Sequence, residues 1–332
     1  MLIDFHFHLE EGPYSISWLS RTMRAIQRTQ LYSTNSGEFE SSTIHWMENM
    51  VERLAARVKQ GSFSYDWLQA YLNTGKQKGI ERFGVVDHLY RFREFKPYYE
   101  KYMLIDDSPL GRLQRTWLDK VCTSSIDEYL SLATKASEIH EELSFGIEAD
   151  YFLGGEAELR SYLDAYPFDY VIGSVHFVDG WGFDNPETEQ RFQEFDLPAL
   201  YDRFFHVLMQ GIQSGMFDIM AHLDNLKVFN HRPDENILLL YYREVAKALK
   251  KGNMASEANT GLWYRYPVKE MCPSVTFLNI LQQEGVPLTL SSDAHFPDDI
   301  GSHLAEAVEL LKQAGYDEIV YFAKKERHTL KI

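Results

Sequence analysis

Residues 2–8 read LIDFHFH, an apolar run that ends in two histidines separated by a phenylalanine. Its aliphatic and aromatic content predicts a β-strand. Successive side chains of a strand point to opposite sides, so His6 and His8 share one side and Phe7 faces the other. Two imidazoles on one side are typical of a metal chelate, although two structural histidines would give the same pattern.

Six further strand-like runs follow, at about 82–87, 143–148, 169–174, 217–222, 254–258 and 287–292. Amphipathic stretches with helical spacing lie between most of them, at 126–140, 156–166, 197–214, 235–250, 274–284 and 302–314. Strands that alternate with helices predict right-handed βαβ units and a parallel sheet. Seven or eight such units suggest a closed α/β barrel, and an open doubly wound sheet is the competing arrangement.

No internal repeat, low-complexity tract or long flexible linker marks a domain boundary, so we expect one domain over residues 1–332. Two regions interrupt the alternation. Residues 13–79 carry three helix-like segments, and residues 91–125 are rich in aromatic and charged side chains. We interpret both as insertions on βα loops, where lids and substrate-selecting elements are usually found.

The composition excludes several classes of protein. A net charge of −16 opposes general binding to nucleic acids and anionic membranes, whereas a small phosphorylated substrate could still bind beside metal cations. Two cysteines, Cys122 and Cys272, cannot form a disulfide framework or a thiolate zinc site. The N-terminal residues lack the pattern of a signal peptide and no apolar run is long enough to span a bilayer, so we expect a cytoplasmic protein. The oligomeric state stays open.

Side chains that bind metals stand at the C-terminal ends of six of the seven predicted strands. They are His6, His8, His88, Glu148, His176, His222, Asp293 and His295. In a βα barrel these ends meet at one rim, which carries the active site. Imidazoles and carboxylates without thiolates suit zinc, manganese or iron. Eight ligands exceed the need of one ion, so we expect two or three divalent ions with Glu148 as the bridge.

Four cationic side chains follow the predicted strands, namely Arg91, Arg93, Arg265 and Lys269. An arginine guanidinium suits bidentate binding of a phosphate, but each of these residues could equally be a solvated loop charge. The other histidines fall in helical or C-terminal segments and are interpreted as structural or solvated: His45, His140, His206, His231, His303 and His328.

The motifs HFH, DH, GIEADY, IGSVHF, AHLD, EANTG and SSDAH occur in this order between residues 6 and 295. Together they resemble the polymerase-and-histidinol-phosphatase (PHP) superfamily, and more narrowly its histidinol-phosphate phosphatase branch. The resemblance implies a distorted barrel of seven βα units with a trinuclear metal centre. It also implies that NTGLWYRYPVKEMCPS, residues 259–274, is a substrate loop in which Arg265 contacts the phosphate or another part of the substrate.

The resemblance further implies a ligand set. His6, His8, Glu148 and Asp293 would hold the first ion, Glu148, His176 and His222 the second, and His88 with His295 the third. The family usually has another histidine shortly after the HxH pair, where this chain has LEEG, residues 9–12. Glu11, or failing that Glu10, could substitute, and the centre could instead be dinuclear.

The function we expect is hydrolysis of a phosphomonoester, most specifically of L-histidinol phosphate to L-histidinol and phosphate in histidine biosynthesis. A hydroxide between two metal ions would attack phosphorus, Arg265 would balance charge, and a metal-bound water, His295 or Asp293 would protonate the leaving group. The alternatives are another phosphomonoester, a cyclic phosphodiester or a nucleotide as substrate, and a non-catalytic metal-binding interaction module. A metal-dependent amidohydrolase is less consistent, since that class usually has a lysine bridge where this chain has Glu148.

Overall fold

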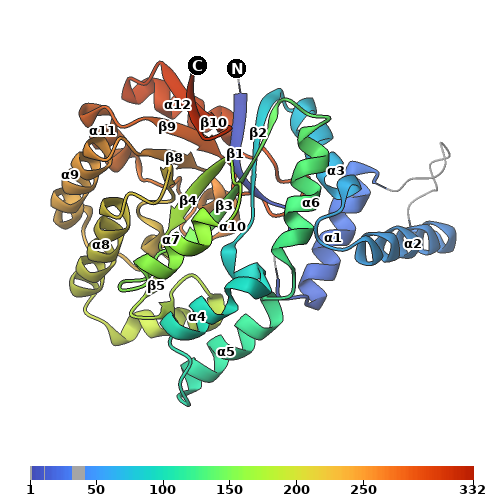
Figure 1. Ribbon diagram of the computed structural model, residues 1–332, viewed down its shortest axis with the longest axis horizontal. Helices are drawn as coiled ribbons and strands as arrows, with labels where there is room; N and C mark the ends of the chain where they lie inside the picture. The colour runs from blue at the N-terminus through green and yellow to red at the C-terminus, as the bar shows by residue number, and fades with distance from the viewer. Residues whose placement is uncertain (1, 11, 32–41) are drawn as a thin grey trace.

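The computed structural model describes residues 2–10, 12–31 and 42–332. Seven strands form a parallel sheet that curls into a barrel surrounded by helices (Figure 1). In spatial order they are β1 (Leu2–His8), β2 (Ile80–Val86), β3 (Leu143–Asp150), β4 (Tyr170–Ser174), β7 (Ile219–Met220), β8 (Ala255–Asn259) and β9 (Leu288–Ser291). All seven predicted strands are confirmed.

The two outer strands of this order meet and close the barrel. The amide of His8 donates to the carbonyl of Ala294, and the amide of Asp293 donates to the carbonyl of His6, both at 2.8 Å. Phe7 and Ala294 form a parallel bridge at the same place. The predicted α/β barrel is therefore confirmed, and the open doubly wound sheet is excluded.

Helices connect the strands and cover the outside of the barrel (Figure 1). The crossover helices are α3 (Tyr65–Gln77), α6 (Ile126–Ser137), α7 (Glu156–Asp164), α8 (Leu197–Gln213), α9 (Glu235–Lys251) and α11 (Val275–Glu284), and α12 (Leu304–Ala314) follows the last strand, β9. Two more, α1 (Ile16–Thr29) and α2 (Ile44–Gln60), precede α3, and α4 (Lys96–Tyr102) and α5 (Pro109–Val121) follow β2. A five-residue helix, α10 (Gly261–Arg265), follows β8. Short 3₁₀ segments cover Leu89–Arg91, Arg93–Phe95, Pro186–Glu194 and Asn225–Lys227.

Side-chain caps explain where most of the long helices begin. A Ser, Thr or Asp oxygen accepts a hydrogen bond from a backbone N–H of the first turn and so satisfies a donor that has no partner inside the helix. The capping residues are Ser15, Thr43, Ser64, Ser108, Ser125, Asp196, Asp234 and Ser274. Gly285, with a positive φ of 67°, ends α11 in the left-handed conformation that glycine adopts without strain.

The alternation in β1 directs the HxH pair as expected. Phe7 points outward and its ring stacks on Tyr71 of α3, with centroids 5.2 Å apart. His6 and His8 point the other way and their Nε2 atoms lie 3.0 Å apart. The pairing of β1 with β2 shifts register between Asp4 and Phe7, so the strand carries an irregularity just before the histidines.

Two hairpins were not anticipated from the sequence. One is short, β5 (Phe177–Val178) with β6 (Trp181–Gly182), and follows β4. The other, β10 (Glu318–Ala323) with β11 (Glu326–Lys331), lies beside the beginning of β1 (Figure 1). Its Tyr321 ring lies 5.8 Å from Phe5 and its Phe322 ring 6.1 Å from Tyr170. Aromatic side chains of this hairpin therefore cover the end of the barrel where the strands begin. Among the described residues, no helix has both the length and the apolar character needed to cross a membrane.

Gly84 of β2 should be intolerant of a side chain. A Cβ at this position would collide with the Tyr170 hydroxyl and would lie 2.7 Å from the Phe5 ring, and both rings are buried. We expect Gly84→Ala to lower the free energy of unfolding by about 1–3 kcal/mol, because neither ring has room to move. Urea denaturation followed by circular dichroism measures this.

Gly252→Ala is the matched control, since Gly252 ends α9 with a φ of −76° and its Cβ would meet only ordinary contacts. Equal unfolding midpoints for Gly84→Ala and the unmodified protein would contradict the described packing.

Candidate metal centre

The HxH pair of β1 meets two carboxylates at the C-terminal end of the barrel. Glu148 Oε2 lies 3.2 Å from His6 Nε2 and 3.3 Å from His8 Nε2. Asp293 Oδ1 lies 3.5 Å from His8 Nε2 and 4.0 Å from His6 Nε2. His6, His8 and Asp293 thus each present a ligand atom to one small volume.

Glu148, on β3, lies at the middle of the cluster. Besides the HxH pair, its carboxylate is 3.0 Å from His222 Nε2, 3.7 Å from His176 Nε2 and 2.9 Å from His88 Nδ1. Burial by itself would raise the pKa of Glu148, but the charges of His88 and His6 and the hydrogen bonds from histidine outweigh it and hold the pKa well below its usual range. The carboxylate is therefore ionised, and it touches histidines from five different positions of the chain.

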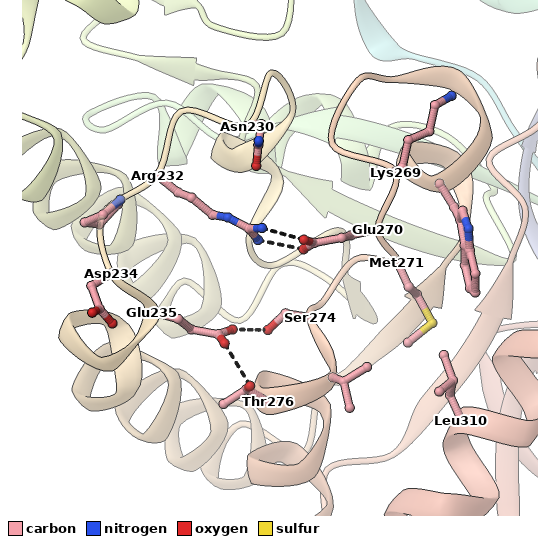
Figure 2. A pocket seen from close by; sticks show the side chains of 13 residues that line it. Asn230, Arg232, Asp234, Glu235, Lys269, Glu270, Met271, Ser274, Thr276 and Leu310 are labelled. Atoms are coloured by element: carbon pink, nitrogen blue, oxygen red, sulfur yellow. Dashed lines mark hydrogen bonds and ion pairs between the residues drawn. The ribbon is translucent and has the colours of Figure 1, made fainter.

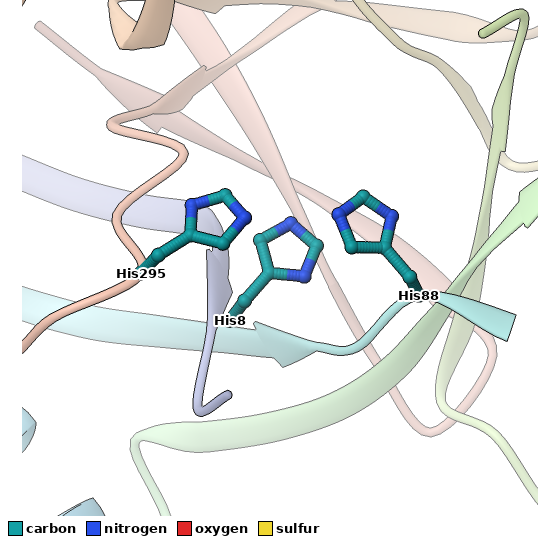
Figure 3. Close-up of side chains that lie close together, drawn as sticks. All are labelled: His8, His88 and His295. Atoms are coloured by element: carbon teal, nitrogen blue, oxygen red, sulfur yellow. The ribbon is translucent and has the colours of Figure 1, made fainter. Parts of the chain in front are cut away.

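The imidazoles of His8, His88 and His295 stand side by side (Figure 3). The His8 ring stacks between His88, at a centroid distance of 4.2 Å, and His295, at 4.4 Å. Burial lowers the pKa of His88 to about 4, and burial together with the charge of Arg265 holds the pKa of His295 well below its usual value. Both rings are neutral near pH 7, which is the state in which a ring nitrogen can bind a metal.

The positions of the ring nitrogens fit divalent cations. His6 Nδ1 lies 2.9 Å from Glu257 Oε2, which directs His6 Nε2 toward His8 Nε2, 3.0 Å away. Among the described residues, the buried His8 Nδ1 and His222 Nδ1 have no hydrogen-bond partner. Burial lowers the pKa of His6, yet the charges of Glu257 and Glu148 raise it well above its usual value. The cluster therefore favours positive charge between its lone pairs, which divalent ions supply.

Glu257 of β8 positions two of the candidate ligands, His6 and His222, through hydrogen bonds. Its carboxylate accepts hydrogen bonds from His6 Nδ1 at 2.9 Å, from the backbone N–H of His222 at 3.0 Å, from Asn259 Nδ2 at 2.9 Å and from Ser291 Oγ at 2.7 Å. Such partners fix the tautomer and orientation of metal-binding histidines. Glu257 had no predicted role beyond its place in the EANTG motif, because a carboxylate in the middle of a strand does not indicate which residues it will contact.

Asp150 does the same for His176. Its Oδ1 lies 2.8 Å from His176 Nδ1, and its Oδ2 accepts from the Tyr99 hydroxyl at 2.8 Å. His176 Nε2 is thereby directed toward Glu148. Asp150 was also missed, although its place two residues after Glu148, on the same side of β3, could have indicated it.

The backbone is strained at two of the candidate ligands. His222 has a φ of 27° and Asp293 a φ of 51°, in the left-handed region that favours glycine. Each follows the end of a strand and is held there by a backbone hydrogen bond, to Glu257 and to the carbonyl of His6 respectively. Strain of this kind clusters at functional sites, where it directs a side chain that a regular strand would turn elsewhere.

A cavity opens directly over the cluster. Its wall includes candidate ligands, namely His88, Glu148, His176, His222, Asp293 and His295, with Asp184, Asn225, Leu262, Arg265 and four aromatic residues, Tyr90, Trp117, Phe177 and Tyr266. Trp117 belongs to α5, so the predicted insertion 91–125 does reach this cavity. None of the described residues of the insertion 13–79 lines it.

Arg265 is the one of the four sequence-predicted cations that lines this cavity. Its Nη1 lies 3.1 Å from the carbonyl oxygen of Asp293 and 3.4 Å from Asp293 Oδ1. Arg91 donates to the carbonyl of Val121 and to the hydroxyl of Tyr14, Arg93 to the carbonyl of Thr123, and Lys269 to the carbonyl of Tyr264.

Glu11, or failing that Glu10, was expected as a further ligand of the third metal ion. Glu11 lies outside the described residues. Glu10 is buried, and its carboxylate accepts from Arg57 at 2.7 Å and from the indole N–H of Trp18 at 3.0 Å. Glu10 thus joins β1 to the helices of the 13–79 insertion. It is not among the three groups of converging ligand atoms, which are His8 with His88 and His295, His6 with His8 and Asp293, and His88 with Glu148 and His176.

A larger hollow, of about 990 Å³, lies away from the metal-binding side chains, between the beginning of α9, residues 269–276 and α12 (Figure 2). Its central charges pair with each other, since Arg232 binds Glu270 through two contacts of 2.7 and 2.5 Å. Glu235 accepts from Ser274 and Thr276. The groups with the chemistry of a catalytic site are therefore at the smaller cavity.

Comparisons with known proteins agree with this geometry. The family model described as PHP domain matches residues 63–261. A probable histidinol-phosphatase of Deinococcus radiodurans is 30% identical over 226 residues, covering 66% of this chain and 84% of that protein, and a histidinol-phosphatase of Lactococcus lactis is 27% identical over 192 residues, covering 55% and 68%.

Among solved structures, the fold is similar to that of the histidinol phosphate phosphatase from Lactococcus lactis, complexed with Zn, L-histidinol and phosphate. The TM-score is 0.57 at 19% identity, and the match covers 78% of this chain and 92% of that one. The chain belongs to the PHP domain family and, within it, to the histidinol-phosphate phosphatase branch.

Proposed function

We propose that this phosphatase hydrolyses L-histidinol phosphate to L-histidinol and phosphate with the help of two or three divalent ions, zinc, manganese or iron. The observation that carries the proposal is the buried Glu148 carboxylate with five histidines around it, directly below a cavity that also presents Arg265. The names of the relatives support the choice of substrate.

The ligand assignment is the one that the family resemblance implies. The three groups of converging ligand atoms contain all of its described members except His222, whose Nε2 lies 3.0 Å from Glu148 Oε1. His6, His8, Glu148 and Asp293 would hold one ion, and Glu148, His176 and His222 a second. His88 and His295, beside His8, would hold a third, together with Glu11 if that residue reaches the site. Ions bound in this way neutralise charge on the transferring phosphoryl group and lower the pKa of water enough for it to attack at neutral pH.

Side chains of the cavity wall would bind the substrate and exclude water. Arg265 stands beside Asp293 and presents a fixed positive charge to the phosphate oxygens. Trp117, Tyr90 and Tyr266 enclose the cavity with apolar surface, which excludes water and suits the flat imidazole of the substrate. Asp184 supplies a carboxylate to the same wall, suited to the substrate ammonium group. The proton for the leaving alkoxide would come from a water in the cavity, because the pKa values of Asp293 and His295 are held well below their usual ranges and neither side chain is an acid near pH 7.

Phosphate release from a panel of phosphoesters tests the proposal. We expect kcat/KM for histidinol phosphate to exceed that for aryl phosphates by at least about 10²-fold, because only the former has an ammonium group for Asp184, and each well-placed polar contact contributes about tenfold or more. Elemental analysis of the same preparation gives the metals. Equal rates for histidinol phosphate and aryl phosphates would defeat the substrate assignment, and no release with any metal despite stoichiometric binding would indicate a non-catalytic module.

Glu148→Gln should remove metal and turnover together. The amide loses the charge that five histidines and the ions share, so we expect metal content to fall and kcat to drop by about 10³-fold or more. Glu142→Gln is the matched control, since Glu142 precedes the same strand at its other end and pairs with Lys76. Full metal content with near-normal phosphate release in Glu148→Gln would rule out the bridging role.

Glu257→Gln should weaken metal binding without touching the substrate. An amide cannot accept from all four donors that surround Glu257, so His6 and His222 lose their fixed orientation, and we expect metal affinity to fall by about 10–100-fold. Competition with a chelator measures this, and excess metal should restore most of kcat with KM unchanged. If chelator competition gives the same affinity as for the unmodified protein, Glu257 does not position the ligands.

A further inference from the structure

Exposed apolar side chains gather on one part of the molecule. Of the twelve large hydrophobic residues with exposed side chains among the described residues, seven lie between positions 14 and 58, on or beside α1 and α2. Four of them belong to α2: Ile44, Met47, Val51 and Val58, each between 51% and 57% exposed. Single exposed aliphatic residues are normal on a protein surface, whereas a cluster of this kind marks an interaction site.

The four residues of α2 form a continuous stripe. Their spacing is three, four and seven residues, the apolar repeat of a helix that packs lengthwise against another helix. Leu54, which is partly buried, fills the gap in the repeat between Val51 and Val58. The stripe therefore covers the whole length of α2.

The side of α2 next to this stripe is already fixed to the protein. Met50 and Arg57 are buried, and Arg57 binds Glu10 at 2.7 Å and lies over the Trp67 ring at 4.3 Å. Arg53 donates to the carbonyls of Leu31 and Ile26 at 2.7 Å. The helix extends away from the barrel (Figure 1), so its exposed stripe stands clear of the rest of the chain that the structure describes.

Helix α1 continues the apolar surface. Leu19 of α1 and Val58 of α2 line one hollow of about 300 Å³ together with Tyr14 and Trp18. Ile16, one turn before Leu19, is 83% exposed. We call the set Tyr14, Ile16, Leu19, Ile44, Met47, Val51 and Val58 the α1–α2 apolar face.

We infer that the α1–α2 apolar face docks against the same face of a second copy of this chain, with the two α2 helices antiparallel. The distribution of charge along α2 favours a second copy of the chain as the partner. Glu48 lies in the first half of the helix, Glu52 at its middle, and the exposed Lys59 in its last turn. An antiparallel pair brings the end that carries Glu48 toward the end of the other helix that carries Lys59, whereas a parallel pair sets Glu48 beside Glu48 and Lys59 beside Lys59.

The overall charge also directs association to this region. The chain has a net charge of −16, but residues 13–62 contain six Lys or Arg and four Glu. Two copies that meet here avoid most of the repulsion between their acidic surfaces. Antiparallel helices, moreover, bring the opposite ends of their dipoles together.

Sedimentation equilibrium of the full chain, loaded with zinc, tests the inference. We expect a dimer, and we expect Val51→Glu to weaken it by at least about 10²-fold, because two carboxylates then meet in the middle of an apolar contact. Val51 is exposed, so the circular dichroism spectrum should stay unchanged. Leu240→Glu is the matched control, since Leu240 of α9 is 65% exposed outside the face, and it should leave the dimer intact.

Cross-linking tests the orientation. Cys122 and Cys272 are buried, so introduced cysteines are the accessible thiols. Ile44→Cys and Val58→Cys, mixed and allowed to exchange subunits, should cross-link to each other in the antiparallel pair, and each alone should cross-link poorly. A monomer at every concentration, a dimer that survives Val51→Glu, or cross-linking of each variant to itself and not to the other would overturn the proposal.

Discussion

The carboxylate of Glu257 is the constraint on which both the barrel and its metal-binding cluster depend. Burying a charged carboxylate lowers the stability of a protein unless hydrogen bonds from the protein replace the water that the charge loses. Here the four donors come from β1, from the turn after β7, from β8 itself and from β9. A shift of one residue in any of these strands would turn its donor to the wrong side and leave the charge unsatisfied, so the carboxylate fixes their register.

The same carboxylate explains how the ligands acquire their directions. It binds one nitrogen of His6, so that the other faces His8 and Glu148, and it binds the backbone of His222 in a conformation that the residue would not adopt alone. Asp150 acts in the same way on His176. Each imidazole near Glu148 is thus held by a second acidic group or lies against a neighbouring ring.

The sequence predicted the parts of this arrangement that depend on local pattern. The seven strands and most helices follow from apolar periodicity, and the candidate ligands follow from polar residues at strand ends, because parallel strands of a barrel end at one rim. Their roles as ligands are still predictions. Glu257, Asp150 and the bond between Glu10 and Arg57 could not be predicted, since each depends on a partner brought close only by folding. The hairpin after α12 was missed because its alternation is weak and its contacts are with the distant Phe5 and Tyr170.

The seam between β1 and β9 has a consequence for folding. The amides and carbonyls that close the barrel belong to His6, His8, Asp293 and Ala294, and Ser292 binds Asp4 from 288 positions away. Contacts between such distant segments form late, because the intervening chain loses its entropy before they can form. Three of the residues at this seam are also candidate ligands. Ions bound there would connect β1 to β9, the pair of strands that closes the barrel. The free energy of metal binding would then contribute to the stability of the closed barrel.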